Sequence, residues 1–377
     1  MVWLLRFSGL LMLILLAPSA SRAQQAGEAR RVQLTAGVVL KDPAGPIRSP
    51  AFSPDGKLIA TLSADHTVRL WGVVTGSEQA VLKHTAAVAS VAFSPDSSLV
   101  VTASEDRTAH LWETATGRER TVLSGHPGFV RTAVFSPDGK VVATGSEDNT
   151  ARLWEVATGV ERTVLRHSGA VRVVTFSADG KLLYTYDSQS ARLWDVATGV
   201  ERAVLKGIYP IAVGPLSPDG TLVITTSPRD RAQLWEMATA TERTVLKGHT
   251  DSVTHAMFSP DAKLVFTASM DRTARIWDAT TGAEQAILDR RMRVGRAAFS
   301  PDGKLIVTTS RDTARPAEVA KKSERPTSRD IARLWDVATG SERAVLKDVT
   351  SAVFSPDSKF LVTVSADATA QLWSIVN

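Results

Sequence analysis

Three sets of histidine, serine, aspartate and tryptophan residues stand at matching offsets along the chain. Serine, histidine and aspartate can together form a nucleophilic site, in which the histidine removes the serine proton and the carboxylate orients the histidine. A catalytic site is needed once in a protein, whereas a packing device is needed in every repeated unit, so three copies favour a structural role. The sets are His84, Ser104, Asp106 and Trp112; His126, Ser146, Asp148 and Trp154; and His249, Ser269, Asp271 and Trp277.

The remaining sequence offers little further chemistry. Its 377 residues include no cysteine, which excludes disulfides, thiolate metal ligands and cysteine nucleophiles. No nucleophile-elbow, zinc-protease, phosphate-loop or calcium-loop motif occurs. The histidines outside the recurring positions, His66, His110 and His255, do not cluster in the sequence. We therefore expect no catalytic residue, no cofactor and no metal site.

The elements that position the three sets belong to a repeated unit of roughly 41 residues. Each unit has a turn of the Phe-Ser-Pro-Asp-Gly type, two short runs of strand composition, a tryptophan, and in most units a Thr-Gly turn and another run. With the run before the phenylalanine, this predicts four short strands in each unit. The tryptophans are Trp71, Trp112, Trp154, Trp194, Trp235, Trp277, Trp335 and Trp373.

At these residues the chain resembles the WD-repeat β-propeller family, as an exported bacterial-type member, over about residues 38–377. The resemblance implies an all-β, eight-bladed propeller with four antiparallel strands per blade. It also implies that each set forms a buried relay of hydrogen bonds, from the indole N–H through a hydroxyl and the imidazole to the carboxylate. As a departure from the family pattern, the Gly-His pair is intact only at His126 and His249.

The two ends of the chain predict how the ring closes. The chain ends four residues after Trp373, so the last unit lacks its outermost strand. Residues 38–42 stand in the register of that missing strand, because Leu40 precedes Phe52 by 12 residues. We expect residues 24–37 to form a leader and residues 38–377 a single propeller, closed by the N-terminal outer strand.

Some units lack part of the set. Unit four has Ser188 where the aspartate is expected, and Asp42 stands near the place of the histidine in unit one. Units seven and eight also lack the histidine. We expect these units to depend more on apolar packing than the others.

Residues 1–23 have the layout of a secretory signal peptide, with an apolar run to Ala17 and small residues Ser21 and Ala23 before Gln24. The run has about 11 residues, fewer than the ~20 needed to cross a bilayer. This favours cleavage over retention as an anchor. We expect an exported protein, periplasmic or secreted, with no membrane span after cleavage.

An insertion breaks the repeat in unit seven, where the gap before Trp335 reaches 58 residues. It covers residues 314–331, between the second and third strands, and carries Lys321, Lys322 and Arg325. In the WD-repeat family this turn lies on the face most used for partners, so the three basic residues are candidates for partner binding. The alternative is a surface loop that the fold tolerates.

Three further basic residues, Arg48, Arg131 and Arg172, begin the innermost strands of their units on the same face. If they point to the mouth of the central channel, they form a positive collar suited to an acidic peptide or an anionic group. The alternative is that they are ordinary solvated surface charges.

These features together predict an exported, non-enzymatic scaffold that binds protein or peptide partners through one face and remains a monomeric ring. The near balance of 44 basic and 39 acidic residues argues against a nucleic-acid partner. The alternatives are an extracytoplasmic propeller hydrolase or lyase, which would need a polar constellation that occurs once, and a structural subunit of an envelope complex.

Overall fold

The computed structural model describes residues 33–45, 47–187, 189–206, 216–226, 232–237, 239, 241–289, 294–311, 330–365, 367 and 369–376. The signal peptide predicted for residues 1–23 lies outside these ranges. Residues 31–377 form one unit. Within the described residues the secondary structure is strand and turn, with no helix, and so with no helix that has the length and apolar character to cross a membrane.

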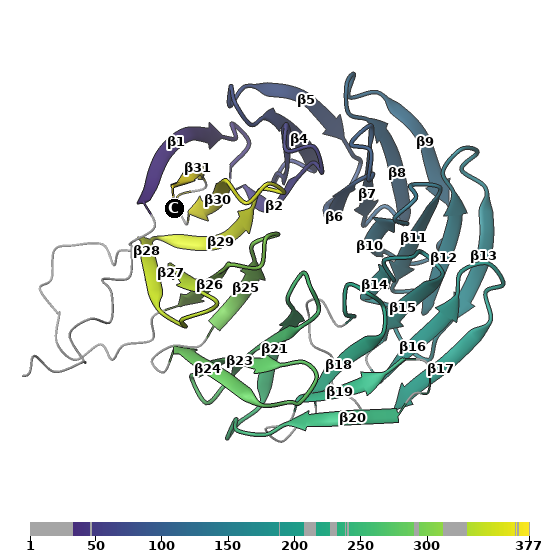
Figure 1. The fold of residues 1–377 in the computed structure, drawn as a ribbon. Helices are drawn as coiled ribbons and strands as arrows, with labels where there is room; N and C mark the ends of the chain where they lie inside the picture. Colours follow the sequence, from purple (N-terminus) through teal and green to yellow (C-terminus); the bar gives the residue numbers. More distant parts are fainter. Residues whose placement is uncertain are drawn as a thin grey trace, which may run out of the picture. The chain divides into compact units, whose positions relative to one another are not determined.

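The strands form eight sheets that follow one another in sequence order around a ring (Figure 1). Neighbouring strands within a sheet are antiparallel, and the first strand faces the centre in the seven blades whose four strands are described (Figure 1). Blade one contains β2 (Arg48–Phe52), β3 (Leu58–Leu62), β4 (Thr67–Gly72) and β5 (Glu78–Lys83). Blade two contains β6 (Val88–Phe93), β7 (Leu99–Ser104), β8 (Thr108–Glu113) and β9 (Glu119–Ser124). Blade three contains β10 (Val130–Phe135), β11 (Val141–Ser146), β12 (Thr150–Glu155) and β13 (Glu161–Arg166). Blade four contains β14 (Val173–Phe176), β15 (Leu182–Tyr186), β16 (Ser190–Asp195) and β17 (Glu201–Lys206).

The second half of the ring repeats this plan. Blade five has β18 (Leu222–Thr226), β19 (Ala232–Glu236) and β20 (Thr241–Leu246), with the bridge Leu216↔Val223 at the place of its inner strand. Blade six contains β21 (Val253–Phe258), β22 (Leu264–Ser269), β23 (Ala274–Asp278) and β24 (Glu284–Asp289). Blade seven contains β25 (Val294–Phe299), β26 (Leu305–Arg311), β27 (Asp330–Asp336) and β28 (Glu342–Lys347). Blade eight contains β29 (Val349–Phe354), β30 (Phe360–Ser365), β31 (Thr369–Val376) and β1 (Gln33–Lys41).

The predicted ring closure is confirmed, because β1 pairs with β31 and completes blade eight. The register places Leu40 opposite Ala370. The strand starts at Gln33, five residues before the predicted start, since β31 continues to Val376 and offers partners to the earlier residues. Residues 33–37 of the expected leader are therefore part of the propeller.

Apolar side chains fill the junctions between adjacent blades. Eight groups of buried residues occur, one at each junction, including the junction of blades eight and one, which buries Leu40 and Trp71 together. Trp154 packs in the same way against residues of blade two such as Val101. The tryptophans thus contribute to the inter-blade core, as strand alternation predicts.

Two kinds of loop define the two faces of the ring. The loops that join an outer strand to the next inner strand, and a second strand to a third strand, lie on one face; in blade two they are residues 84–87 and 105–107, joined by the hydrogen bond from Glu105 N–H to the Ala87 carbonyl (2.9 Å). We call this the loop face. The Pro-Asp-Gly and Thr-Gly turns lie on the opposite face. In the first of these turns, the Ser53 hydroxyl donates to Asp55 (2.6 Å) and accepts from the Leu58 N–H (2.9 Å).

Candidate functional site

In blades three and six a chain of hydrogen bonds links the tryptophan to the loop face. The Trp154 indole N–H donates to Thr144 Oγ1 (2.8 Å), and Thr144 Oγ1 lies 2.7 Å from His126 Nε2. His126 Nδ1 lies 2.7 Å from Asp148 Oδ2. His126 Nδ1 donates its proton to the carboxylate, and the Thr144 hydroxyl donates its proton to Nε2, so every polar group of this relay has a hydrogen-bond partner. Blade six repeats the arrangement with Trp277, Thr267, His249 and Asp271.

The hydroxyl in this relay belongs to a threonine, which corrects the prediction of a serine. Ser146 instead donates to the Gly128 carbonyl (3.1 Å) and accepts from the Asp148 N–H (3.1 Å), so it shapes the loop. The same indole-to-threonine hydrogen bond occurs in all eight blades. The acceptors are Thr61, Thr102, Thr144, Thr185, Thr225, Thr267, Thr308 and Thr363.

The electrostatics of the relay fit a structural role. Burial lowers the pKa of His126 below its ordinary value and outweighs the opposing hydrogen bond to Asp148. Burial alone would raise the pKa of Asp148, but hydrogen bonds from Thr150 and His126 outweigh it and lower that pKa. At neutral pH the pair is therefore a neutral imidazole that donates to a carboxylate. Thr144 is fully buried, so no substrate reaches its hydroxyl.

Blade four keeps the histidine but places its carboxylate one residue earlier than the sequence predicts. Asp187 Oδ2 lies 3.4 Å from His167 Nδ1, and both side chains are fully buried. The Ser190 N–H donates to the other oxygen of Asp187 (2.7 Å). Thr185 precedes Trp194 by nine residues, whereas Thr144 precedes Trp154 by ten, so this blade is one residue shorter between the second and third strands. Ser188, the residue predicted to replace the aspartate, lies outside the described residues.

Because of the buried His167 imidazole, we expect the folded protein to lose stability in mild acid. Burial lowers the pKa of His167 from 6.5 to about 4, against the opposing charge of Asp187. Below pH 6.5 the unfolded chain binds a proton at His167 that the folded chain excludes. The contribution of His167 to the free energy of unfolding is therefore fully present above pH 6.5 and is lost as the pH falls toward 4. By about pH 5 the protonation of this single group should lower the free energy of unfolding by about 2 kcal/mol. Urea denaturation across this range should show a smaller loss for His167→Gln than for the wild type; equal losses would contradict the assignment.

In blades one to seven, a glutamate at the start of the outer strand pairs with a side chain of the third strand. In blades three and six the donors are Arg152 and Arg275, with Nη1 at 2.5 Å from Glu161 and Glu284. Blade two has a histidine at this position. The other pairs are Arg69 with Glu78, Arg192 with Glu201, Gln233 with Glu242, and Arg333 with Glu342.

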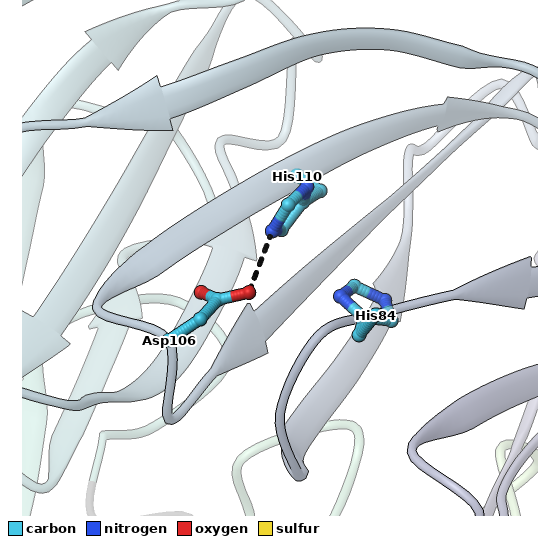
Figure 2. Close-up of side chains that lie close together, drawn as sticks. All are labelled: His84, Asp106 and His110. Carbon is cyan, nitrogen blue, oxygen red and sulfur yellow. Dashed lines mark hydrogen bonds and ion pairs between the residues drawn. The ribbon is translucent and has the colours of Figure 1, made fainter.

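In blade two, that histidine brings a second imidazole next to the predicted set. His110 Nδ1 lies 2.5 Å from Glu119 Oε1, and His110 Nε2 lies 3.4 Å from Asp106 Oδ2. The ring of His84 meets the ring of His110 edge to face, with 4.7 Å between their centres. Figure 2 shows the three side chains of His84, Asp106 and His110 together. His110, predicted to stand apart from the other histidines, therefore lies beside His84 and Asp106.

The His84 imidazole does not take the place that His126 takes in blade three. Both of its nitrogens are buried without a hydrogen-bond partner. The cause is a connection that is one residue shorter, since Leu82 precedes His84 by two residues whereas Leu123 precedes His126 by three. Burial and the neighbouring His110 lower the pKa of His84 to about 4, so the ring is neutral at pH 7.

The three predicted collar arginines do not have equivalent surroundings. Arg48 and Arg172 are exposed. Arg131 forms ion pairs with Glu105 (2.8 Å) and Glu147 (2.6 Å), and the hydrogen bond that Arg131 donates to Glu147 is the main cause that raises the pKa of Arg131. The charge of Arg131 is therefore compensated on the loop face. Of the three arginines, Arg48 and Arg172 keep the exposed charge that the collar hypothesis requires.

Comparison with known families identifies the fold family. The model for the WD domain, G-beta repeat, matches six segments that together cover more than half of the chain: residues 37–72, 76–113, 117–155, 159–195, 240–278 and 339–374. The chain belongs to the WD40 family. The matched segments correspond to blades one, two, three, four, six and eight. The WD40 model leaves blade five and the interrupted blade seven unmatched.

A solved structure supports the same architecture for this WD40 protein. The crystal structure of the computationally designed Ika8 protein has a TM-score of 0.73 and 23% identity, and the match covers 89% of this chain and 98% of that chain. At this identity the similarity shows the fold alone. A comparison with curated proteins returns no match.

Blade one of the WD40 ring replaces the relay with a buried ion pair, which corrects the expectation that it depends on apolar packing. Asp42 Oδ1 lies 2.9 Å from Arg69 Nε, with side chains 0% and 9% exposed. The Ser63 hydroxyl donates to the same carboxylate. Arg69 also pairs with Asp65 (2.9 Å) and Glu78 (2.6 Å). This arginine thus ties the N-terminal connection to the third and outer strands.

The insertion in blade seven begins and ends at the loop face. Strands β26 and β27 pair from Leu305↔Asp336 to Arg311↔Asp330, so the ladder continues up to the insertion. Asp330 and Ile331, predicted to end the insertion, belong to β27 because they pair with Arg311 and Ser310. Lys321, Lys322 and Arg325, the predicted partner-binding residues of the insertion, lie outside the described residues.

Proposed function

We propose that the chain is an exported, non-enzymatic scaffold that binds a protein or peptide partner through its loop face. WD40 propellers commonly mediate protein interactions, and this chain has that fold. The Ser-His-Asp sets that raised the alternative of catalysis are accounted for by buried hydrogen bonds in blades three and six. The export half of the proposal rests on the layout of residues 1–23, and cleavage after Ala23 would leave β1 whole.

The observation that best supports the loop face is an exposed aromatic side chain stacked with an arginine. Phe129 lies in the loop between β9 and β10 and is 40% exposed. The Arg131 guanidinium lies over its ring, 5.4 Å from the centre. Aromatic and arginine side chains are enriched where protein interfaces gain most of their binding energy. Met270, in the loop between β22 and β23 of blade six, is also exposed on this face.

Charge reversal on the two faces tests the proposal. The loop-face variant is Lys321→Glu, Lys322→Glu and Arg325→Glu. The matched control reverses three exposed lysines in turns of the opposite face: Lys181→Glu, Lys263→Glu and Lys304→Glu. Both variants change the net charge equally, so a difference between them reports location.

The measurement is the affinity of each variant for a partner that copurifies from the extracytoplasmic fraction of the native host. The loop-face variant and Phe129→Ala should each bind about tenfold more weakly. The opposite-face control should bind within about twofold of the wild type, and wild-type binding should weaken with salt. Equal losses in both triple variants, or absence of the protein outside the cytoplasm, would contradict the proposal.

A further inference from the structure

We propose that blade two holds one divalent transition-metal ion, with Zn²⁺ preferred, bound by His84, Asp106 and His110. The site lies where the loop face meets β8. His84 follows β5, Asp106 lies between β7 and β8, and His110 is the third residue of β8. This inference is independent of the proposed partner binding.

The three side chains present a set of ligand atoms suited to zinc. Within the part of the chain that the structure describes, two imidazole nitrogens and a carboxylate oxygen lie within 4.8 Å of one another. Zinc bonds of about 2.0–2.1 Å at tetrahedral angles separate ligand atoms by about 3.3 Å. Asp106 Oδ2 and His110 Nε2 are already 3.4 Å apart. To complete the set, one His84 nitrogen, which lies within 4.8 Å of the other two ligand atoms, must approach them to about 3.3 Å.

The surroundings hold two of these ligands in the orientation that a metal requires. Glu119 accepts from His110 Nδ1 (2.5 Å), which leaves Nε2 directed at Asp106. A carboxylate behind a metal-binding histidine is the usual second partner of such a ring. Asp106 Oδ1 accepts from the Thr108 N–H (3.0 Å) and hydroxyl (2.5 Å), so Oδ2 faces the other two ligands.

Two threonine hydroxyls lie within hydrogen-bond distance of the ligand atoms of Asp106 and His110. Thr85 donates to Asp106 Oδ2 (3.1 Å), and Thr108 Oγ1 lies 2.7 Å from His110 Nε2. The Thr85 hydroxyl can turn away on its own side-chain bond when a metal binds, and Thr108 can keep its single proton on Asp106 Oδ1, which leaves His110 Nε2 available to the metal. The His84 nitrogens, by contrast, are buried with no hydrogen-bond partner, and a metal would satisfy one of them.

Other blades show which feature makes blade two distinct. His167 in blade four also has buried nitrogens without a hydrogen-bond partner, so that condition alone does not define a metal site. Blade four has Arg192 at the position of His110, and blade three has Arg152 there. An arginine cannot bind a metal because it stays protonated. The second histidine is therefore what converts a structural position into a set of three ligands.

Three protein ligands leave the fourth tetrahedral position open to water. The side chains of Asp106 and His110 are 15% and 12% exposed, so solvent can reach this position. Two nitrogens and one oxygen favour zinc over magnesium or calcium, which prefer oxygen ligands alone.

The test measures Zn²⁺ binding to the purified protein, without a polyhistidine tag, by titration calorimetry. The melting temperature is measured with Zn²⁺ and with a chelator. The wild type should bind one Zn²⁺ per chain and melt at a higher temperature with Zn²⁺ than with a chelator. His110→Arg introduces the residue found in blades three and six, where it pairs with the outer-strand glutamate, so this variant should fold normally. It should bind Zn²⁺ at least about 100-fold more weakly, as should His84→Asn.

Two further variants make the result specific. Glu119→Gln should weaken Zn²⁺ binding by about 10–100-fold, since it acts through His110. His66→Asn removes an exposed histidine elsewhere in the chain and should leave Zn²⁺ binding unchanged. The proposal is overturned if the wild type binds no Zn²⁺, or if His110→Arg folds and binds Zn²⁺ as tightly as the wild type.

Discussion

A chain that begins at Asp42 should lose most of its folding stability, whereas a chain that begins at Gln24 should melt at the temperature of the full-length protein. The first deletion removes β1, which pairs with β31 from Gln33↔Val376 to Lys41↔Thr369. Leu40 is 2% exposed in the core between blades eight and one. Loss of one such leucine costs about 2–5 kcal/mol. The deletion also leaves β31 as an unpaired edge.

The expected result is a melting temperature lower by at least about 10 °C, or no cooperative transition. A pair of substitutions in β1 provides the control. Leu40→Ala should cost about 2–5 kcal/mol in urea denaturation. Val39→Ala should cost less than about 1 kcal/mol, because Val39 is 43% exposed. A chain lacking β1 that melts like the wild type would show that the ring does not close through this strand.

Thr144→Val should destabilise the protein by about 3 kcal/mol, because it leaves two buried groups without a hydrogen-bond partner. The Trp154 indole N–H would lose its acceptor, and His126 Nε2 would lose its donor. Valine keeps the shape of threonine, so the loss reports the hydroxyl and not the packing. Urea denaturation at neutral pH measures the difference.

Ser146→Ala is the matched control, since it removes the hydroxyl that the sequence pattern predicts for the relay. It should cost only about 1 kcal/mol, because its bonds to Gly128 and Asp148 are made in the loop. Asp148→Ala should cost about 1–3 kcal/mol. A larger loss for Ser146→Ala than for Thr144→Val would contradict the relay described for blade three.

The repeat, the number of blades and the closing strand could be predicted because they follow from local patterns. A Pro-Asp-Gly turn, a strand of alternating character and an interior tryptophan recur at nearly constant spacing, and each has the same physical consequence in every blade. The place of β1 followed from the missing outer strand after Trp373 and from the spacing of Leu40 and Phe52. Its additional residues depended on how far β31 extends beyond Trp373, which spacing does not determine.

The candidate sites were less predictable because they depend on which hydroxyl or ring faces which neighbour. Thr144 and Ser146 lie two residues apart on one strand and offer the same chemistry, and only the register with Trp154 distinguishes them. The threonine recurs before every tryptophan, so this pattern was available. The contact of His110 with His84 depended on a connection one residue shorter in blade two, whose effect on side-chain position no spacing rule describes.

Exposed valines on the opposite face provide a competing surface for partners. Val74, Val160 and Val200, all in Thr-Gly turns, are 87%, 62% and 55% exposed. They are smaller than Phe129 and have no arginine stacked on them in the described contacts. Locating the bound partner distinguishes the two faces directly.

Hydrogen exchange of the protein with and without its copurified partner tests the loop-face proposal most directly. We expect that protection from hydrogen exchange on binding is confined to the loop face. The protected segments should include residues 126–131, which contain Phe129, and residues 84–87 and 105–107 of blade two. The turns that contain Val74, Val160 and Val200 should exchange at the same rate in both samples. Protection of those turns, with unchanged exchange on the loop face, would contradict the account.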